Sequence, residues 1–154
     1  MLENIENVND NEVQVEDGVP DPATVKKLQE IYQQLDIANA DAEALRQLVQ
    51  LSFLKVIRKD AIQANHQMTP DTIGFLMAFL IEKVTKINRS YSIFDPAVGT
   101  ANLLTTVINQ LQKASKEPIH GYGIDNDSAM LEVASASVAL QKLNVDLYHQ
   151  DAIN

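Results

Sequence analysis

The sequence predicts an α/β protein in which a helical region precedes a sheet of three parallel strands. Between residues 91 and 148, short apolar runs alternate with longer stretches of helical periodicity. The expected strands are residues 91–94, 119–124 and 145–148, and the expected helices between them are about residues 100–115 and 128–143. Strands that alternate with helices of this length are joined by right-handed crossovers, which place the strands in parallel in one sheet.

Three helix starts are expected before the first strand. Asp21-Pro22 is typical of a capping acid followed by proline in the first helical turn, and Asp41 is a similar cap. Thr69-Pro70-Asp71 offers a capping hydroxyl, a proline and an acid that the helix dipole favours. Apolar residues between 45 and 57 recur on more than one face, so we expect that helix to be sandwiched between neighbours.

The acidic residues are unevenly distributed along the chain. Residues 1–22 hold seven of the 21 acids and no Lys or Arg, whereas the remainder holds 14 acids and 12 bases, a net charge of about −2. A polar segment of one charge sign without periodicity is typical of disorder. We therefore expect a disordered acidic arm over residues 1–20, a helical region over 21–65, and the sheet-containing domain over 66–154. The near-neutral body neither supports nor excludes contact with DNA.

Composition excludes several other classes of protein. The 154 residues, of which 45% are apolar, suffice for one ordinary core. No apolar run approaches the length of about 18 residues that spans a membrane, and the polar, acidic start is unlike a signal peptide, so a cytoplasmic location is expected. With no cysteine, and with His66, His120 and His149 scattered, neither a disulfide framework nor a metal site is expected.

Each expected strand is followed by an acid, in the place where open parallel sheets bind ligands. The first acid, Asp95, precedes a short loop in which Gly99 allows a ligand to approach the backbone closely. Asp125, after the second strand, is placed to accept hydrogen bonds from ribose hydroxyls, and Asp151, after the third, to accept one from an adenine amine. Purely structural explanations also exist, because Asp-Pro is a common turn and both Asp125 and Asp127 can begin the next helix.

The first loop does not match a dinucleotide site. It contains one glycine, whereas the dinucleotide fingerprint G-x-G-x-x-G needs more backbone clearance for a pyrophosphate. Neither a P-loop nor a nucleophile elbow G-x-S-x-G is present. A cofactor with adenosine but without phosphates, S-adenosylmethionine, fits the looser loop and the acids at the strand ends.

Four segments resemble the motifs of N6-adenine DNA methyltransferases. Residues 94–104, FDPAVGTANLL, are similar to the D-P-A-C-G-S-G-x-F-L cofactor motif, and residues 66–73 resemble the T-P-x-x-I helix start, which in this family contacts the methionine end of the cofactor. Residues 123–127 resemble G-x-[DE]-x-D, whose first acid holds the ribose, and 150–152 resemble the segment whose Asp holds the adenine. The segments occur in the family's order over roughly residues 66–154. Modification subunits of type I restriction systems are the most similar, since a helical region also precedes their T-P-x-x-I segment.

The resemblance implies a partial Rossmann-like class I methyltransferase sheet and methyl transfer from S-adenosylmethionine to adenine N6 in DNA. It also implies that regions absent from this chain contact DNA, and that the helical N-terminal region holds a homodimer partner or a specificity subunit. The implied cofactor-binding residues are Met68, Thr69, Pro70, Asp95, Pro96, Ala97, Gly99, Thr100, Asn102, Leu103, Asp125, Asn126, Asp151 and Ala152.

The sequence departs from the family pattern in two ways. In the cofactor motif, Val98 replaces the usual Cys or Ser, Thr100-Ala101 replaces Ser-Gly, and Asn102 stands where a glycine or an aromatic is common. The [DN]-P-P-[YF] motif, which holds the flipped adenine for methylation, occurs nowhere in the chain. We therefore expect the N-terminal part of an enzyme, inactive by itself. The alternative is a non-catalytic module that uses a degenerate methyltransferase fold for interaction or dimerisation.

Overall fold

The computed structural model describes residues 13, 15, 20–34, 36, 39–60, 68–85 and 91–153, without the side chains of 56–60. The chain forms two compact units, Met1–Ala40 and Asp41–Asn154. The first contains helix α2 (Pro22–Gln34), and the expected acidic arm over residues 1–20 lies almost entirely outside the described residues. No helix in the described ranges is both long and apolar enough to cross a membrane.

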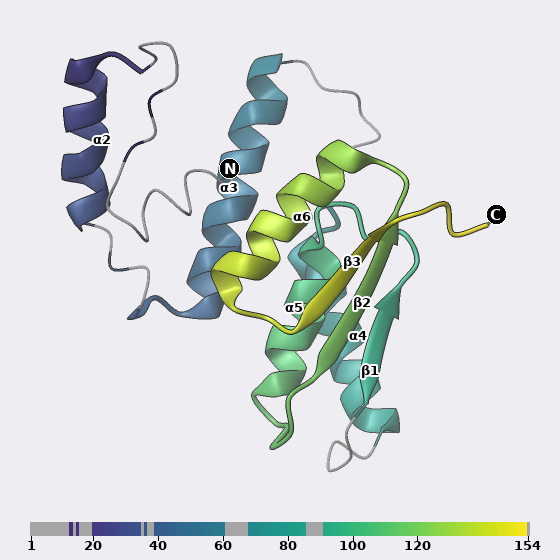
Figure 1. The fold of residues 1–154 in the computed structure, drawn as a ribbon. Helices are drawn as coiled ribbons and strands as arrows, with labels where there is room; N and C mark the ends of the chain where they lie inside the picture. Colours follow the sequence, from purple (N-terminus) through teal and green to yellow (C-terminus); the bar gives the residue numbers. More distant parts are fainter. Residues whose placement is uncertain are drawn as a thin grey trace. The chain divides into compact units, whose positions relative to one another are not determined.

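The second unit contains the predicted sheet. Its elements in order are α3 (Ala42–Asp60), α4 (Asp71–Val84), β1 (Ser92–Asp95), α5 (Asn102–Gln112), β2 (His120–Asp125), α6 (Ser128–Gln141) and β3 (Val145–His149) (Figure 1). The three strands are parallel in the order β1-β2-β3, with Phe94 paired to Tyr122 and Ile124 paired to Tyr148. The α/β class and the three parallel strands predicted from the sequence are confirmed.

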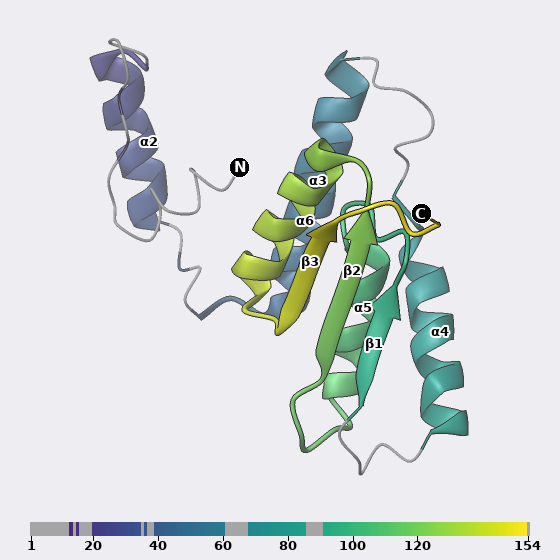
Figure 2. The same cartoon turned by 45° about the vertical axis from the view of Figure 1, so that its right-hand side comes forward.

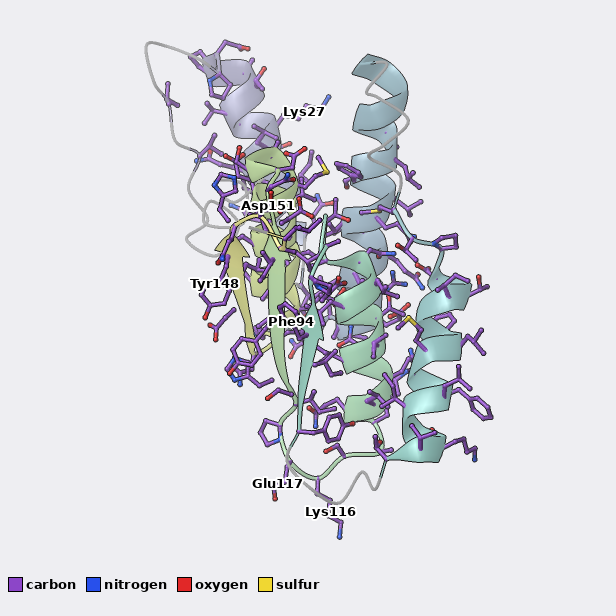
Figure 3. All side chains as sticks on the ribbon, turned by 90° about the vertical axis from the view of Figure 1, so that its right-hand side faces the viewer. Lys27, Phe94, Lys116, Glu117, Tyr148 and Asp151 are labelled. Carbon is purple, nitrogen blue, oxygen red and sulfur yellow. The ribbon has the colours of Figure 1, made fainter. Side chains whose placement is uncertain are left out.

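The crossover helices α5 and α6 pack on the same face of the sheet, and the strands stand in front of them in Figure 2. Because both crossovers run in the same direction across the sheet, right-handed connections bring both helices to one side. The core between the layers includes Val98, Leu104, Ile108 and Val138. Among the described helices of the second unit, none covers the opposite face, and Tyr148 points away from α5 there (Figure 3).

Helix α3 packs in the same unit as the sheet, against α5 and α6. Its buried apolar residues Leu45, Val49 and Phe53 are spaced four apart and form one stripe, whereas Leu48 and Leu51 are exposed. The expectation of a helix sandwiched between neighbours was therefore wrong. Within the second unit, the described part of α3 packs against α5 and α6 through this stripe.

Helix α4 packs against α5 through its smallest residues. Gly74 and Ala78 are buried and Ile81 is partly buried against the core, whereas the other large apolar side chains of the helix are exposed. The predicted start is corrected, since Pro70 occupies the N-cap position and no side chain caps the helix. Thr69 lies one residue too early for its hydroxyl to serve as the cap.

Candidate functional site

The loop that joins β1 to α5 is anchored to β2. Val98 is buried in the core, and its backbone N–H donates to the carbonyl oxygen of Ile124 at 2.9 Å. A Cβ on Gly123 would lie 2.7 Å from a Val98 methyl carbon, so the absence of a side chain at Gly123 makes room for Val98. An apolar side chain thus fills the position where the related motif carries Cys or Ser.

The same loop turns sharply before α5 begins. Gly99 has a φ of 52°, and Ala101, at the N-cap of α5, has a φ of 60°. Left-handed backbone costs a non-glycine residue roughly 1–2 kcal/mol, and Ala101 adopts it at a fully buried position. The turn therefore forms although Ala101 stands where the related motif has its second glycine.

Asp125 joins this loop to the following one. Its Oδ2 accepts a hydrogen bond from the Gly99 backbone N–H at 2.8 Å, and its Oδ1 accepts one from the Asp127 N–H at 2.9 Å. A carboxylate oxygen has a second lone pair, so each oxygen retains the capacity to accept another donor. The two bonds fix the orientation of the carboxylate before any ligand arrives.

Asp95 lies at the end of the neighbouring strand in a less compensated environment. Burial raises the pKa of its carboxyl, the hydrogen bond from the Ala97 N–H, at 3.1 Å, lowers it, and the nearby charge of Asp125 raises it further. The carboxyl groups of Asp95 and Asp125 therefore lie near one another at the carboxyl end of the sheet, and ionisation of Asp95 is the costly one.

A pocket of about 570 Å³ opens between these loops at the carboxyl ends of β1 and β2. Asp95, Asp125 and Asp127 contribute acids to its wall, and no Lys or Arg among the described residues lines it. The lining residues are Met68, Thr69, Asp95, Ala97, Val98, Gly99, Thr100, Asn102, Leu103, Asp125, Asn126, Asp127 and Met130. The pocket is thus of a size for a small molecule and suits a cationic one.

Ten of the implied cofactor residues line this pocket, and four do not. The ten are Met68, Thr69, Asp95, Ala97, Gly99, Thr100, Asn102, Leu103, Asp125 and Asn126. Pro70 and Pro96 are adjacent in sequence to lining residues but are exposed, and Asp151 and Ala152 are also exposed. Asp151 nevertheless lies at the pocket's end of the sheet, whereas Lys116 and Glu117 lie at the other end (Figure 3). Asp151 Oδ1 instead accepts a hydrogen bond from the Ile153 N–H at 2.9 Å.

Sequence reasoning missed three lining residues, Val98, Asp127 and Met130. Asp127 was considered only as a helix cap, which it is, because its Oδ1 accepts hydrogen bonds from the Ala129 and Met130 N–H groups. The first turn of a helix that follows a strand faces the carboxyl end of the sheet, and this placement is the signal for both Asp127 and Met130. His66 and Gln67, upstream of the Met68 wall, lie outside the described residues.

Comparison with known proteins assigns the family. Residues 53–154 match the family described as N-6 DNA Methylase. The chain belongs to the N-6 DNA methylase family. Within the family's match lie the whole sheet, both crossover helices and every residue that lines the pocket. Helix α2 and the first half of α3 precede it.

Two similar proteins extend the comparison. A Listeria monocytogenes structure, provisionally assigned as a class I S-adenosylmethionine-dependent methyltransferase, is 41% identical and superposes with a TM-score of 0.83 over 99% of this chain and 45% of that one. An uncharacterised Bacillus subtilis protein, YtxK, is 37% identical over 135 residues, which are 88% of this chain and 40% of YtxK. This N-6 DNA methylase chain therefore has the class I methyltransferase fold and spans less than half the length of both relatives.

Proposed function

We propose that the pocket binds S-adenosylmethionine and that the chain is the cofactor-binding part of an enzyme that methylates adenine N6 in DNA. The observation that carries the proposal is the acid-lined pocket at the carboxyl ends of β1 and β2. Membership of the N-6 DNA methylase family supports both the cofactor and the acceptor.

The charge of the pocket distinguishes between cofactors that contain adenosine. S-adenosylmethionine carries a sulfonium and an ammonium against one carboxylate, so a wall whose described residues include three acids and no base attracts it. A dinucleotide carries two phosphates, which the same wall repels and which the loop, with one glycine, leaves little room to approach. The electrostatics therefore favour the methyl donor.

The side chains divide the work of binding between them. The Asp125 carboxylate, held by two backbone N–H groups, keeps its remaining lone pairs for the two ribose hydroxyls. Asp95 balances the positive methionine end, beside Met68 and Thr69, while Leu103 and Met130 supply apolar surface. When bound, the cofactor supplies an electrophilic methyl group, and the protein's part is to orient it toward an acceptor amine and to exclude water.

Calorimetry with S-adenosylmethionine tests the cofactor. Asp125→Asn keeps the shape of the side chain but removes its charge, and we expect a ten- to hundredfold weaker affinity, equivalent to about 1.5–3 kcal/mol. Asp146→Asn is the matched control, since Asp146 is an exposed acid on β3 that pairs with His120. Equal affinity for Asp125→Asn and wild type would remove Asp125 from the ribose role.

The wild-type titrations also decide between the proposed function and its alternatives. Tighter binding of NAD than of S-adenosylmethionine would show that the pocket binds a dinucleotide and not the methyl donor. Binding of neither by the wild type would overturn the proposal and favour the non-catalytic interaction module.

A further inference from the structure

A buried arginine outside the family match lies behind the pocket. Arg46, on α3, is 1% exposed, and each of its five N–H donors has an acceptor. Its Nε and one terminal nitrogen bind both oxygens of Glu43, at 2.9 and 2.6 Å. Its two terminal nitrogens bind both oxygens of Asp71, each at 2.9 Å, and one also donates to Asn102 Oδ1 at 2.7 Å. One guanidinium thus joins the beginnings of α3, α4 and α5.

The ionic balance of this cluster makes the arginine hard to replace. The hydrogen bonds to Glu43 raise the pKa of Arg46 despite its burial. Burial alone would raise the pKa of Asp71, but hydrogen bonds from Arg46 and Asn102 outweigh it and the pKa is lowered. All three groups are therefore ionised at neutral pH, and removal of the cation would leave two acids facing one another.

Asn102 carries the contact from this cluster to the pocket wall. Its side chain is 5% exposed, and because Oδ1 accepts from Arg46, Nδ2 must point the other way. Nδ2 donates to the Thr69 carbonyl oxygen at 2.9 Å and to Asp71 Oδ1 at 3.2 Å. Thr69 and Asn102 both line the pocket. The amide of Asn102 therefore fastens the Met68–Thr69 wall to the start of α5, and Arg46 sets its orientation.

We infer that Arg46 is a positioning residue for the cofactor pocket, acting through Asn102 to hold the Met68–Thr69 wall against the loop that contains Gly99. The inference rests on the proposed function for its ligand, but the clamp itself is a property of the free chain. It extends the site to a helix whose first half precedes the family match. A fork of donors is needed here, since lysine has three donors on a single atom and cannot bind two carboxylates and an amide in this planar geometry.

Arg46→Lys tests the clamp while keeping the charge. We expect about tenfold weaker binding of S-adenosylmethionine at a temperature where both chains are fully folded, within the usual range for coupling between sites. Amide hydrogen exchange in residues 68–73 of the free chain should become about tenfold faster, while exchange in β2 stays unchanged. Lys55→Met, which removes an exposed cation from the same helix, is the control and should change neither measurement.

A double-mutant cycle with Asn102→Ala tests the route. Asn102→Ala by itself leaves the hydrogen bonds of Arg46 to Glu43 and Asp71 in place, so faster exchange in residues 68–73 of that variant tests the clamp even if Arg46→Lys does not fold. If Arg46 acts through Asn102, then Arg46→Lys adds little further loss of affinity in the Asn102→Ala background. Additive losses, or a uniform rise in exchange throughout the unit, would overturn the inference and leave Arg46 a general stabiliser. A wild type that binds no cofactor would overturn the proposed function instead, and the exchange pattern of the free chain would then decide the clamp by itself.

Discussion

Asp95 and Asp125 occupy equivalent places at the ends of adjacent strands but have different surroundings. Two backbone N–H groups hold the carboxylate of Asp125, whereas Asp95 accepts a single hydrogen bond from the Ala97 N–H. Burial and the neighbouring charge raise the pKa of Asp95. The free protein therefore bears a cost when Asp95 ionises, and a cation that enters the pocket relieves it.

This arrangement predicts a pH-dependent affinity. A raised pKa means that the free site binds its proton more tightly than an ordinary carboxyl does, so the native state loses stability from Asp95 as the pH rises through that pKa. A cationic ligand prefers the ionised form. We expect affinity for S-adenosylmethionine to fall as the pH is lowered through the raised pKa of Asp95, and Asp95→Asn to weaken binding at neutral pH and flatten the profile.

Adenosine, which carries neither the sulfonium nor the ammonium, serves as the control ligand for the pH titration. Its affinity should show no such slope in either protein. Equal slopes in wild type and Asp95→Asn would assign the pH dependence to another group.

At the scale of helices and strands, the features that depend on local sequence could be predicted, whereas those that depend on tertiary contacts could not. Asp21, Asp41 and Asp127 accept hydrogen bonds from backbone N–H groups in the first turn of the following helix, as predicted. The cap at Thr69 was wrong because Pro70 takes the N-cap position, while the Thr69 carbonyl binds Asn102. Capping depends on residues adjacent in sequence, whereas the partner of Thr69 is 33 residues away.

The candidate site shows the same division. Strand ends locate the acids of the pocket from sequence order alone, since parallel strands bring their carboxyl ends together. Arg46 carries no such signal, because one of several basic residues in a helix is expected to be solvated until Asp71 and Asn102 are known to face it. The burial of Arg46 depends on α3, α4 and α5 together, whereas the periodicity of a sequence describes one helix at a time.

The contact between α4 and α5 yields a prediction at this scale. A Cβ on Gly74 would lie 2.6 Å from Thr106 Cγ2 and 2.9 Å from its Cβ. Gly74→Ala gains about 1 kcal/mol of helix propensity but forces the helices apart at a cost of about 1–3 kcal/mol. We expect a net loss of about 1 kcal/mol, which thermal denaturation of this 154-residue chain would show as a Tm lower by about 2–4 °C.

Thr106→Ser supplies the partner for this test, because it removes the clashing methyl and keeps the hydroxyl that donates to the Asn102 carbonyl at 2.7 Å. The double variant should be more stable than the two single losses together imply. Thr72→Ala, at an exposed position of α4, is the control and should not lower the Tm. A higher Tm for Gly74→Ala would mean that α4 does not pack this closely on α5.

On the scale of the second unit, one face of the sheet exposes aromatic side chains and one side of α4 exposes apolar ones among the described residues. Phe94 is 57% and Tyr148 49% exposed on the sheet, and Leu76 and Leu80 are also exposed on α4. Open parallel sheets ordinarily have helices on both faces. The matched part is 45% of the Listeria monocytogenes chain and 40% of YtxK, so both relatives contain further chain beyond the part that matches.

The last prediction is that residues 1–154 bind S-adenosylmethionine but transfer no methyl group. Transfer requires the acceptor amine to lie in line with the sulfonium carbon, and such orientation supplies several kcal/mol of the barrier reduction. No [DN]-P-P-[YF] motif occurs in the 154 residues, and a duplex must also give up a base at a cost of a few kcal/mol. The measurement incubates radiolabelled cofactor and adenine-containing DNA with this chain and, in parallel, with the longest gene product that contains it. Label in DNA from residues 1–154 alone would show that acceptor-holding residues lie within them, whereas a longer product that binds cofactor but labels no DNA would contradict adenine in DNA as the acceptor.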